Sequence, residues 1–186
     1  MEQSMSKNKS IHELTPEERR EDFHGKDLIL QEHYAPIPPA LFYSDFLFHD
    51  LDDSEFMPSI IMYEHTAIEG EHPWKRQTVP VDDLMDYAWR DDVAINPCGY
   101  WNNYPRKKLM RRVYAFVMDV DEVRPATMEY LISLIEQGKF PRPTVISNSG
   151  SGVHFFYILD VALRVGYREK YLQNFHLADQ IYFMLH

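Results

Sequence analysis

The stretch from Val113 to Leu159 reads VYAFVMDVDEVRPATMEYLISLIEQGKFPRPTVISNSGSGVHFFYIL. Its first eight residues are apolar on both faces apart from Asp119, a pattern typical of a strand in the centre of a sheet. Pro125 predicts the start of a helix with an apolar stripe at helical spacing. The segments Thr144–Ser147 and Val153–Leu159 predict two strands joined as a β-hairpin. This order of elements indicates an α+β fold.

The composition is that of a globular domain with a core. The 186 residues are 45% hydrophobic and include 12 Tyr and 11 Phe, which suits one domain with a leader, or a domain fragment. No run of about 18 apolar residues occurs, so we expect no membrane span. The polar N-terminus lacks an apolar signal region, so we expect a cytoplasmic protein. The single cysteine, Cys98, excludes an intramolecular disulfide and a zinc site built from several cysteines.

Charge is distributed unevenly along the chain. The formal net charge of −10 argues against a generally basic nucleic-acid-binding protein. Residues 1–100 hold 21 acidic and 8 Lys/Arg residues, whereas residues 101–186 hold 8 acidic and 11 Lys/Arg residues. Docking of a partner and solubility of the protein are two interpretations of the acidic first half.

The first 26 residues are polar and predict a mobile leader before a main domain at 27–186. Within the leader, Thr15-Pro16-Glu17-Glu18 is a typical helix start, with threonine as the N-cap and proline in the first helical position. Gly25 predicts the end of this short helix.

The region between the leader and the central strand predicts its secondary structure less clearly than the stretch from Val113 to Leu159. Ser59–Tyr63 predicts a buried strand, and Val81–Arg90 predicts an amphipathic helix. His72–Arg76 predicts a loop, and Val93–Ile95 predicts a short strand that stops at Asn96-Pro97.

A basic run leads into the central strand. No acidic residue occurs from Trp101 to Met118, and the run contains Arg106, Lys107 and Arg111. One interpretation is a solvated surface. The other is a loop that contacts the phosphates of a template or of a triphosphate.

Two carboxylates lie at the end of the central strand. Asp119 and Asp121 are two residues apart, so on a strand their side chains share a face. Adjacent carboxylates repel unless a cation lies between them, and Mg²⁺ and Mn²⁺ prefer such oxygen ligands. A solvated strand end with two acids is the alternative interpretation, because Asp-x-Asp alone is a weak signal.

The hairpin turn is the second candidate element. Its residues Ser149, Gly150, Ser151 and Gly152 precede His154. Glycines permit close approach of the backbone to a ligand, and exposed N–H groups in such a turn form a nest suited to phosphate. A P-loop is excluded because the Gly-Lys-Ser/Thr ending is missing. The alternative for the histidine is a structural role on a strand.

The two motifs together, in this order and about thirty residues apart, resemble the archaeo-eukaryotic primase superfamily. They are especially similar to the primase–polymerase domains of replication proteins on plasmids and integrative mobile elements of Gram-positive bacteria. The resemblance covers roughly residues 90–186. It implies an RRM-like sheet-and-helix catalytic core with an N-terminal α/β extension.

The resemblance also implies roles for individual residues. Asp119 and Asp121 would bind the metal ions, Mg²⁺ or Mn²⁺, and His154 with the turn Ser149–Gly152 would contact the triphosphate. The implied activity is DNA-directed nucleotidyl transfer, with single-stranded DNA as template, NTP or dNTP as substrate and a helicase domain or protein downstream. Arg106, Lys107 and Arg111 are further candidates for nucleotide binding.

One part of the family pattern is missing. The third metal-binding carboxylate is not matched, since Asp160 follows the hairpin too closely and Asp179 lies in a predicted final helix, Glu169–His186. The chain stops inside that helical pattern, so we expect a chain truncated at its C-terminus, with the third carboxylate beyond His186 and this fragment inactive alone. A metal-dependent nuclease, another nucleotidyltransferase, and a non-catalytic DNA- or protein-binding replication-initiation module remain as alternatives.

Overall fold

The computed structural model describes residues 9–49, 59–65, 74–79, 83–87, 90, 93–101, 105–166 and 169–185. The chain divides into two compact units. The hairpin unit comprises Met1–Pro36 and Val117–Phe156, and the sheet unit comprises Ile37–Phe116 and Tyr157–His186. Helices and antiparallel strand pairs both occur, which confirms a mixed α+β fold. No helix in the described part of the chain is long and apolar enough to cross a membrane.

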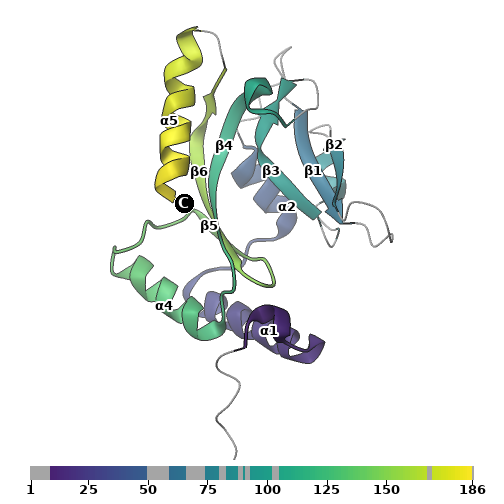
Figure 1. Cartoon of the computed structure of the whole chain (residues 1–186), viewed down its shortest axis with the longest axis vertical. Helices are drawn as coiled ribbons and strands as arrows, with labels where there is room; N and C mark the ends of the chain where they lie inside the picture. The colour runs from purple at the N-terminus through teal and green to yellow at the C-terminus, as the bar shows by residue number, and fades with distance from the viewer. Residues whose placement is uncertain are drawn as a thin grey trace, which may run out of the picture. The chain divides into compact units, whose positions relative to one another are not determined.

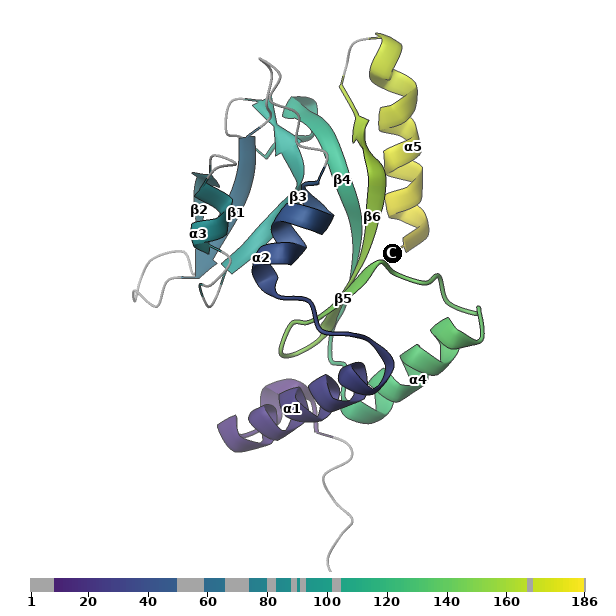
Figure 2. The same ribbon diagram turned by 180° about the vertical axis from the view of Figure 1, so that it is seen from behind.

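The described part of the hairpin unit combines helices with segments of antiparallel strands (Figure 1). Helix α1 spans Pro16–His33 and α4 spans Pro125–Glu136, and the two lie side by side in Figures 1 and 2. Strand β5 is Val145–Asn148, and it pairs antiparallel with the start of β6, Val153–Arg164. The predicted helix and hairpin are therefore confirmed.

Helix α1 begins as predicted but ends later. Thr15 and Glu18 form a reciprocal capping box, in which each side chain accepts a hydrogen bond from the other residue's backbone N–H. The predicted end at Gly25 is wrong, because the helix continues to His33. A Cβ atom at Gly25 would lie 3.0 Å from Cγ of Pro125, so this glycine allows the two helices to approach closely. The boundary predicted at residue 26 thus falls inside a packed helix.

The core of the hairpin unit comes from α4 and β6. The helical spacing predicted a buried face of Met128, Leu131, Ile132 and Ile135 on α4; three of these residues are buried, whereas Leu131 is half-buried. Val153 and Phe155 of β6 are fully buried as well. Together these side chains remove one face of the helix and one face of the strand from water, which is the main source of stability for such a layer.

The sheet unit contains most of the strand pairing. Strands β1 (Ser59–His65), β2 (Trp74–Val79), β3 (Val93–Tyr100) and β4 (Met110–Val120) follow each other along the chain, and the hydrogen-bonded order is β2-β1-β3-β4-β6-β5. Strands β1 and β2, β1 and β3, β3 and β4, and β5 and β6 all pair antiparallel. Strands β4 and β6 contribute residues to both units.

Two predictions about these strands are wrong. Lys75 and Arg76 lie in β2 and not in a loop. Strand β3 does not stop at Asn96-Pro97 but continues to Tyr100, because the register against β1 shifts between Ile60 and Met62. Such a bulge leaves residues out of the ladder and accommodates a proline, which has no N–H to donate.

Helices from different parts of the chain pack on the strands of the sheet unit. A cluster formed by Leu47, Phe48 and Tyr114 packs the turn after the π-helix η2 (Phe42–Leu47) on β4. Helix α5, Glu169–Leu185, runs along β6 in Figures 1 and 2. Its Ala178 packs against a second apolar cluster, formed by Val113, Phe116 and Val165. Helix α3 spans Leu84–Tyr87, whereas Val81, Asp82, Ala88 and Trp89 of that predicted helix lie outside the described residues and Arg90 is not helical.

Candidate functional site

The hairpin unit brings two of the predicted site residues together. His154 Nε2 lies 3.2 Å from Asp119 Oδ1, with the histidine near the start of β6 and the aspartate near the end of β4. Both side chains are partly open to solvent, with exposed fractions of 36% and 54%. A ligand can therefore reach this pair, which is the first requirement for a site.

Asp121 lies beyond the last residue of β4 and its side chain is exposed. The next residue, Glu122, has a φ of 55°, in the left-handed region that non-glycine residues seldom adopt. Its carboxylate accepts a hydrogen bond of 2.7 Å from Ser10 Oγ. The chain thus turns sharply after Asp121, which alters the strand geometry assumed when the two aspartates were placed on one face.

The described residues contain carboxylates suited to a hard cation but no complete cluster. Asp119 and Asp121 are both exposed and carry the oxygen donors that Mg²⁺ or Mn²⁺ prefers. Among the residues that the structure describes, no group of three or more His, Cys, Asp or Glu side chains is placed to hold a metal ion. Asp119 and His154 are therefore a pair rather than part of a larger cluster within that portion of the chain.

The turn between β5 and β6 packs directly on the end of β4. A Cβ atom at Gly152 would lie 2.2 Å from the carbonyl oxygen of Val120 and 3.2 Å from Cα of Asp121. No side chain fits there, since real Cβ contacts are much longer. Val123 N–H also donates a 3.1 Å hydrogen bond to the carbonyl of Ser151. The glycine is therefore required by the contact between the turn and the aspartate segment.

Hydrogen bonds within the turn use some of its N–H groups. Ser149 N–H donates to the carbonyl of Gly152 at 3.2 Å, and Gly150 N–H donates to Oδ1 of Asn148 at 3.2 Å. These two N–H groups are engaged by the protein, so the open phosphate nest predicted for all of Ser149–Gly152 needs correction. The turn presents a more restricted set of donors to a ligand than its sequence suggested.

Lys26 of α1 holds the turn from inside the protein. Its side chain is fully buried, and Nζ donates hydrogen bonds to the carbonyls of Gly150 at 2.6 Å and Gly152 at 3.2 Å. Burial lowers the pKa of Lys26, and the nearby carboxylates of Asp22 and Asp27 oppose that shift. A lysine that bridges two carbonyls fixes the distance between them.

A second set of contacts ties the same turn to α1. Asn148 Nδ2 donates to the carbonyl of Phe23 at 3.0 Å and to Oδ1 of Asp27 at 2.8 Å. The Asp22 carboxylate forms an ion pair with Arg124, the residue before α4. Sequence reasoning missed this support, because Lys26 lies between Gly25 and Asp27 and nothing in that local pattern marks the lysine as buried.

The basic candidates belong to the sheet unit. Arg106 precedes the short helix η5, Lys107–Leu109, and both Arg106 and Lys107 are exposed. Arg111 donates from its guanidinium to the carbonyls of Lys108 at 3.2 Å and Met110 at 2.8 Å. These local hydrogen bonds let Arg111 stabilise the turn before β4.

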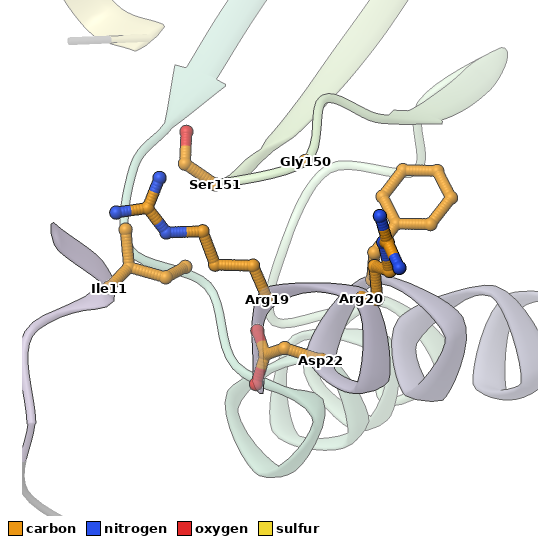
Figure 3. A pocket seen from close by; sticks show the side chains of 7 residues that line it. Ile11, Arg19, Arg20, Asp22, Gly150 and Ser151 are labelled. Atoms are coloured by element: carbon orange, nitrogen blue, oxygen red, sulfur yellow. The ribbon is translucent and has the colours of Figure 1, made fainter. Parts of the chain in front are cut away.

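A cavity of about 570 Å³ opens beside the glycine turn within the hairpin unit. Its lining comes from the segment before α1, from α1 itself and from the turn: Ile11, Arg19, Arg20, Asp22, Phe23, Gly150 and Ser151. In Figure 3, Arg19 reaches toward the side where Ile11 and Ser151 lie, whereas Arg20 projects on the opposite side. No lining residue from α1 was among the predicted site residues.

Comparisons with protein-family models, with curated proteins and with solved structures found no match for the chain. The interpretation of the site therefore rests on its own geometry and on the motifs quoted above.

Proposed function

We propose that the chain carries the nucleotide-binding part of a nucleotidyl-transfer site of the primase–polymerase kind. The observation that carries the proposal is the 3.2 Å approach of His154 Nε2 to Asp119 Oδ1, next to a glycine turn that packs on the same strand end. Motifs about thirty residues apart in the sequence thus supply adjacent side chains. The core would be of the RRM-like primase type.

The carboxylates supply the acidic half of the proposed site. Asp119 and Asp121 would hold Mg²⁺ or Mn²⁺, and a bound divalent ion would activate a 3′-hydroxyl and neutralise the leaving pyrophosphate. Both side chains are exposed, so a hydrated cation can approach them. The third carboxylate of such a site would come from elsewhere.

The histidine supplies the donor for the substrate. His154 Nε2 faces the Asp119 carboxylate, and a protonated ring nitrogen donates equally well to a carboxylate or to a phosphate oxygen. The His154 ring would therefore turn from Asp119 to the triphosphate when the nucleotide binds. Lys26 and Gly152 would hold the turn against the strand during this exchange.

Nucleotide binding tests the proposal. A labelled NTP or dNTP should bind in the presence of Mg²⁺ or Mn²⁺, and His154→Ala should weaken binding by roughly tenfold or more, as expected for loss of a hydrogen bond to a charged group. His33→Ala is the matched control, since His33 also pairs with a carboxylate in the hairpin unit, at 2.8 Å. Equal affinities for the His154 variant and wild type would contradict the proposal.

The type of activity needs a second measurement. Template-dependent primer synthesis should depend on Asp119 and Asp121, and the double variant Asp119→Ala/Asp121→Ala should abolish it. Metal-dependent cutting of DNA without nucleotide would indicate a nuclease instead. Unchanged metal and nucleotide affinity in the double variant would indicate a non-catalytic module.

A further inference from the structure

We propose that the cavity between α1 and the glycine turn binds a phosphorylated nucleotide unit, with Arg19 and Arg20 as its phosphate ligands. This inference deepens the proposed function and rests on it, because the turn residues Gly150 and Ser151 line both the cavity and the proposed triphosphate site. It assigns to α1 a part in ligand binding that the motifs do not predict.

The charge of the cavity lining favours binding of an anionic ligand. Arg19 and Arg20 are exposed and lie on the cavity wall. Asp22 is the acidic residue among the described lining residues, and its carboxylate is paired with Arg124. With two arginines and one carboxylate, the lining carries a net positive formal charge, and guanidinium groups bind phosphate through paired N–H donors.

The other lining groups favour a nucleotide over a simple anion. Phe23 is 41% exposed although it is a large apolar side chain, and an aromatic ring open to a cavity is a stacking surface for a base. The Ser151 side chain is exposed at the cavity and can donate or accept a hydrogen bond.

One buried oxygen atom lacks a hydrogen-bond donor, and a ligand can supply one. Asp22 Oδ2 is buried, and it has no hydrogen-bond partner among the residues that the structure describes. A buried carboxylate oxygen without a donor is costly. A sugar hydroxyl or a base amino group provides such a donor, and inorganic phosphate offers neither a ring to stack on Phe23 nor a base amine for Asp22.

The nucleotide unit has two sources, a free nucleoside triphosphate or a single-stranded nucleic acid. Two fluorescent probes separate them: a labelled nucleoside triphosphate and a labelled oligo(dT), each titrated with the full chain at fixed salt. The variant Arg19→Gln/Arg20→Gln should lose about tenfold or more in affinity for one probe, since charge-assisted bonds to phosphate are lost. Loss for the triphosphate alone assigns the cavity to the substrate, and loss for the oligonucleotide alone assigns it to the strand.

Arg142→Gln is the matched control. Arg142 is an exposed arginine of the same unit and does not line the cavity. If Arg142→Gln weakens binding as much as the double variant, the effect is one of general charge and the inference is wrong. Unchanged binding of both probes to the double variant also overturns it.

A measurement on the wild-type chain avoids any effect on folding. An oligonucleotide or triphosphate carrying a photoreactive base should crosslink to the peptide that contains Phe23, and excess unlabelled ligand should abolish the adduct. Crosslinks confined to other peptides would overturn the inference. If His154→Ala and Asp119→Ala leave both affinities unchanged while the arginine variant weakens one, the cavity assignment stands and the proposed function fails. If His154→Ala and Asp119→Ala weaken binding while the arginine variant does not, only the cavity assignment fails.

Discussion

Two histidine–carboxylate pairs occur among the described residues of the hairpin unit, and they differ mainly in their surroundings. His154 pairs with Asp119 at 3.2 Å, and His33 pairs with Glu136 at 2.8 Å. The exposed fractions are 36% and 54% for the first pair and 35% and 57% for the second. Exposed pairs of this kind contribute little stability. Distance and exposure therefore do not distinguish a candidate site from an ordinary surface contact.

The surroundings do distinguish the two pairs. His33 and Glu136 join the ends of α1 and α4. His154 follows a turn that packs on the strand end carrying Asp119, and a fully buried lysine bonds to that turn. Buried polar groups are costly unless they are satisfied, so such an arrangement fixes the turn in place. The comparison indicates that the candidate site is distinguished by the packed turn and the buried lysine beside the pair, and not by the ion pair itself.

The largest expected effect is that of Gly152→Ala. The added Cβ would lie 2.2 Å from the carbonyl oxygen of Val120, so the turn must move away from the aspartate segment. We expect a loss of about 3 kcal/mol in unfolding free energy, the upper end for overpacking, measured by urea denaturation.

Gly150→Ala is the matched control for this change. Gly150 has a φ of +89° and open space around the Cβ position, so the substitution brings backbone strain of about 1–2 kcal/mol and no collision. Equal losses for the two glycine variants would show that close packing on β4 does not hold the turn.

The next effect is that of Lys26→Met. The variant leaves the carbonyls of Gly150 and Gly152 without their donor, and we expect a loss of about 2 kcal/mol in unfolding free energy. Lys139→Met is the control, because Lys139 is exposed and its substitution should stay within about 0.5 kcal/mol. A Lys26 variant as stable as the control would remove the role given to this residue.

Lys26 also predicts a pH dependence. Burial places its folded pKa below the ordinary value of 10.5, so the unfolded state binds more protons between the two values. The wild type should therefore gain stability relative to Lys26→Met as the pH rises through this window, and the gain should vanish as the pH falls below it. Urea denaturation of both proteins across alkaline pH measures the difference. A constant difference, or one that shrinks as the pH rises, contradicts the assignment.

The smallest effects on stability are expected for Asp119→Ala and Glu136→Ala, which should differ in nucleotide binding. Asp119→Ala and Glu136→Ala should each cost less than about 1 kcal/mol, because both pairs are exposed. The Asp119 variant alone should weaken metal-dependent nucleotide binding, measured by fluorescence anisotropy alongside thermal unfolding. Equal binding by the two variants would place the His154–Asp119 pair with ordinary surface contacts.

Local patterns predicted the elements that carry the candidate site. The apolar run before Asp119, the spacing of Met128, Ile132 and Ile135, and the hairpin segments all correspond to observed elements. The Thr15 N-cap was predicted as well, since capping involves residues three positions apart. These features depend on the periodicity and chemistry of neighbouring residues, which a sequence displays directly.

Contacts between distant segments were not predictable in the same way. Gly25 was interpreted as a helix end, yet it is the point where α1 approaches Pro125. Pro97 was interpreted as the end of a strand, yet a register shift in the β1–β3 pairing lets the strand continue. In both cases a residue that disfavours regular structure locally is accommodated by a partner far away in the chain.

The sequence by itself determined which residues are chemically competent: the aspartates at the end of β4, His154, and a turn rich in glycine. Only the tertiary structure decided that Asp119 meets His154, that Gly152 admits no side chain, and that Lys26 and a cavity lined by Arg19 and Arg20 lie at the same turn. The physical reason is that donors and carbonyls separated by more than a hundred residues are matched only when burial brings them together.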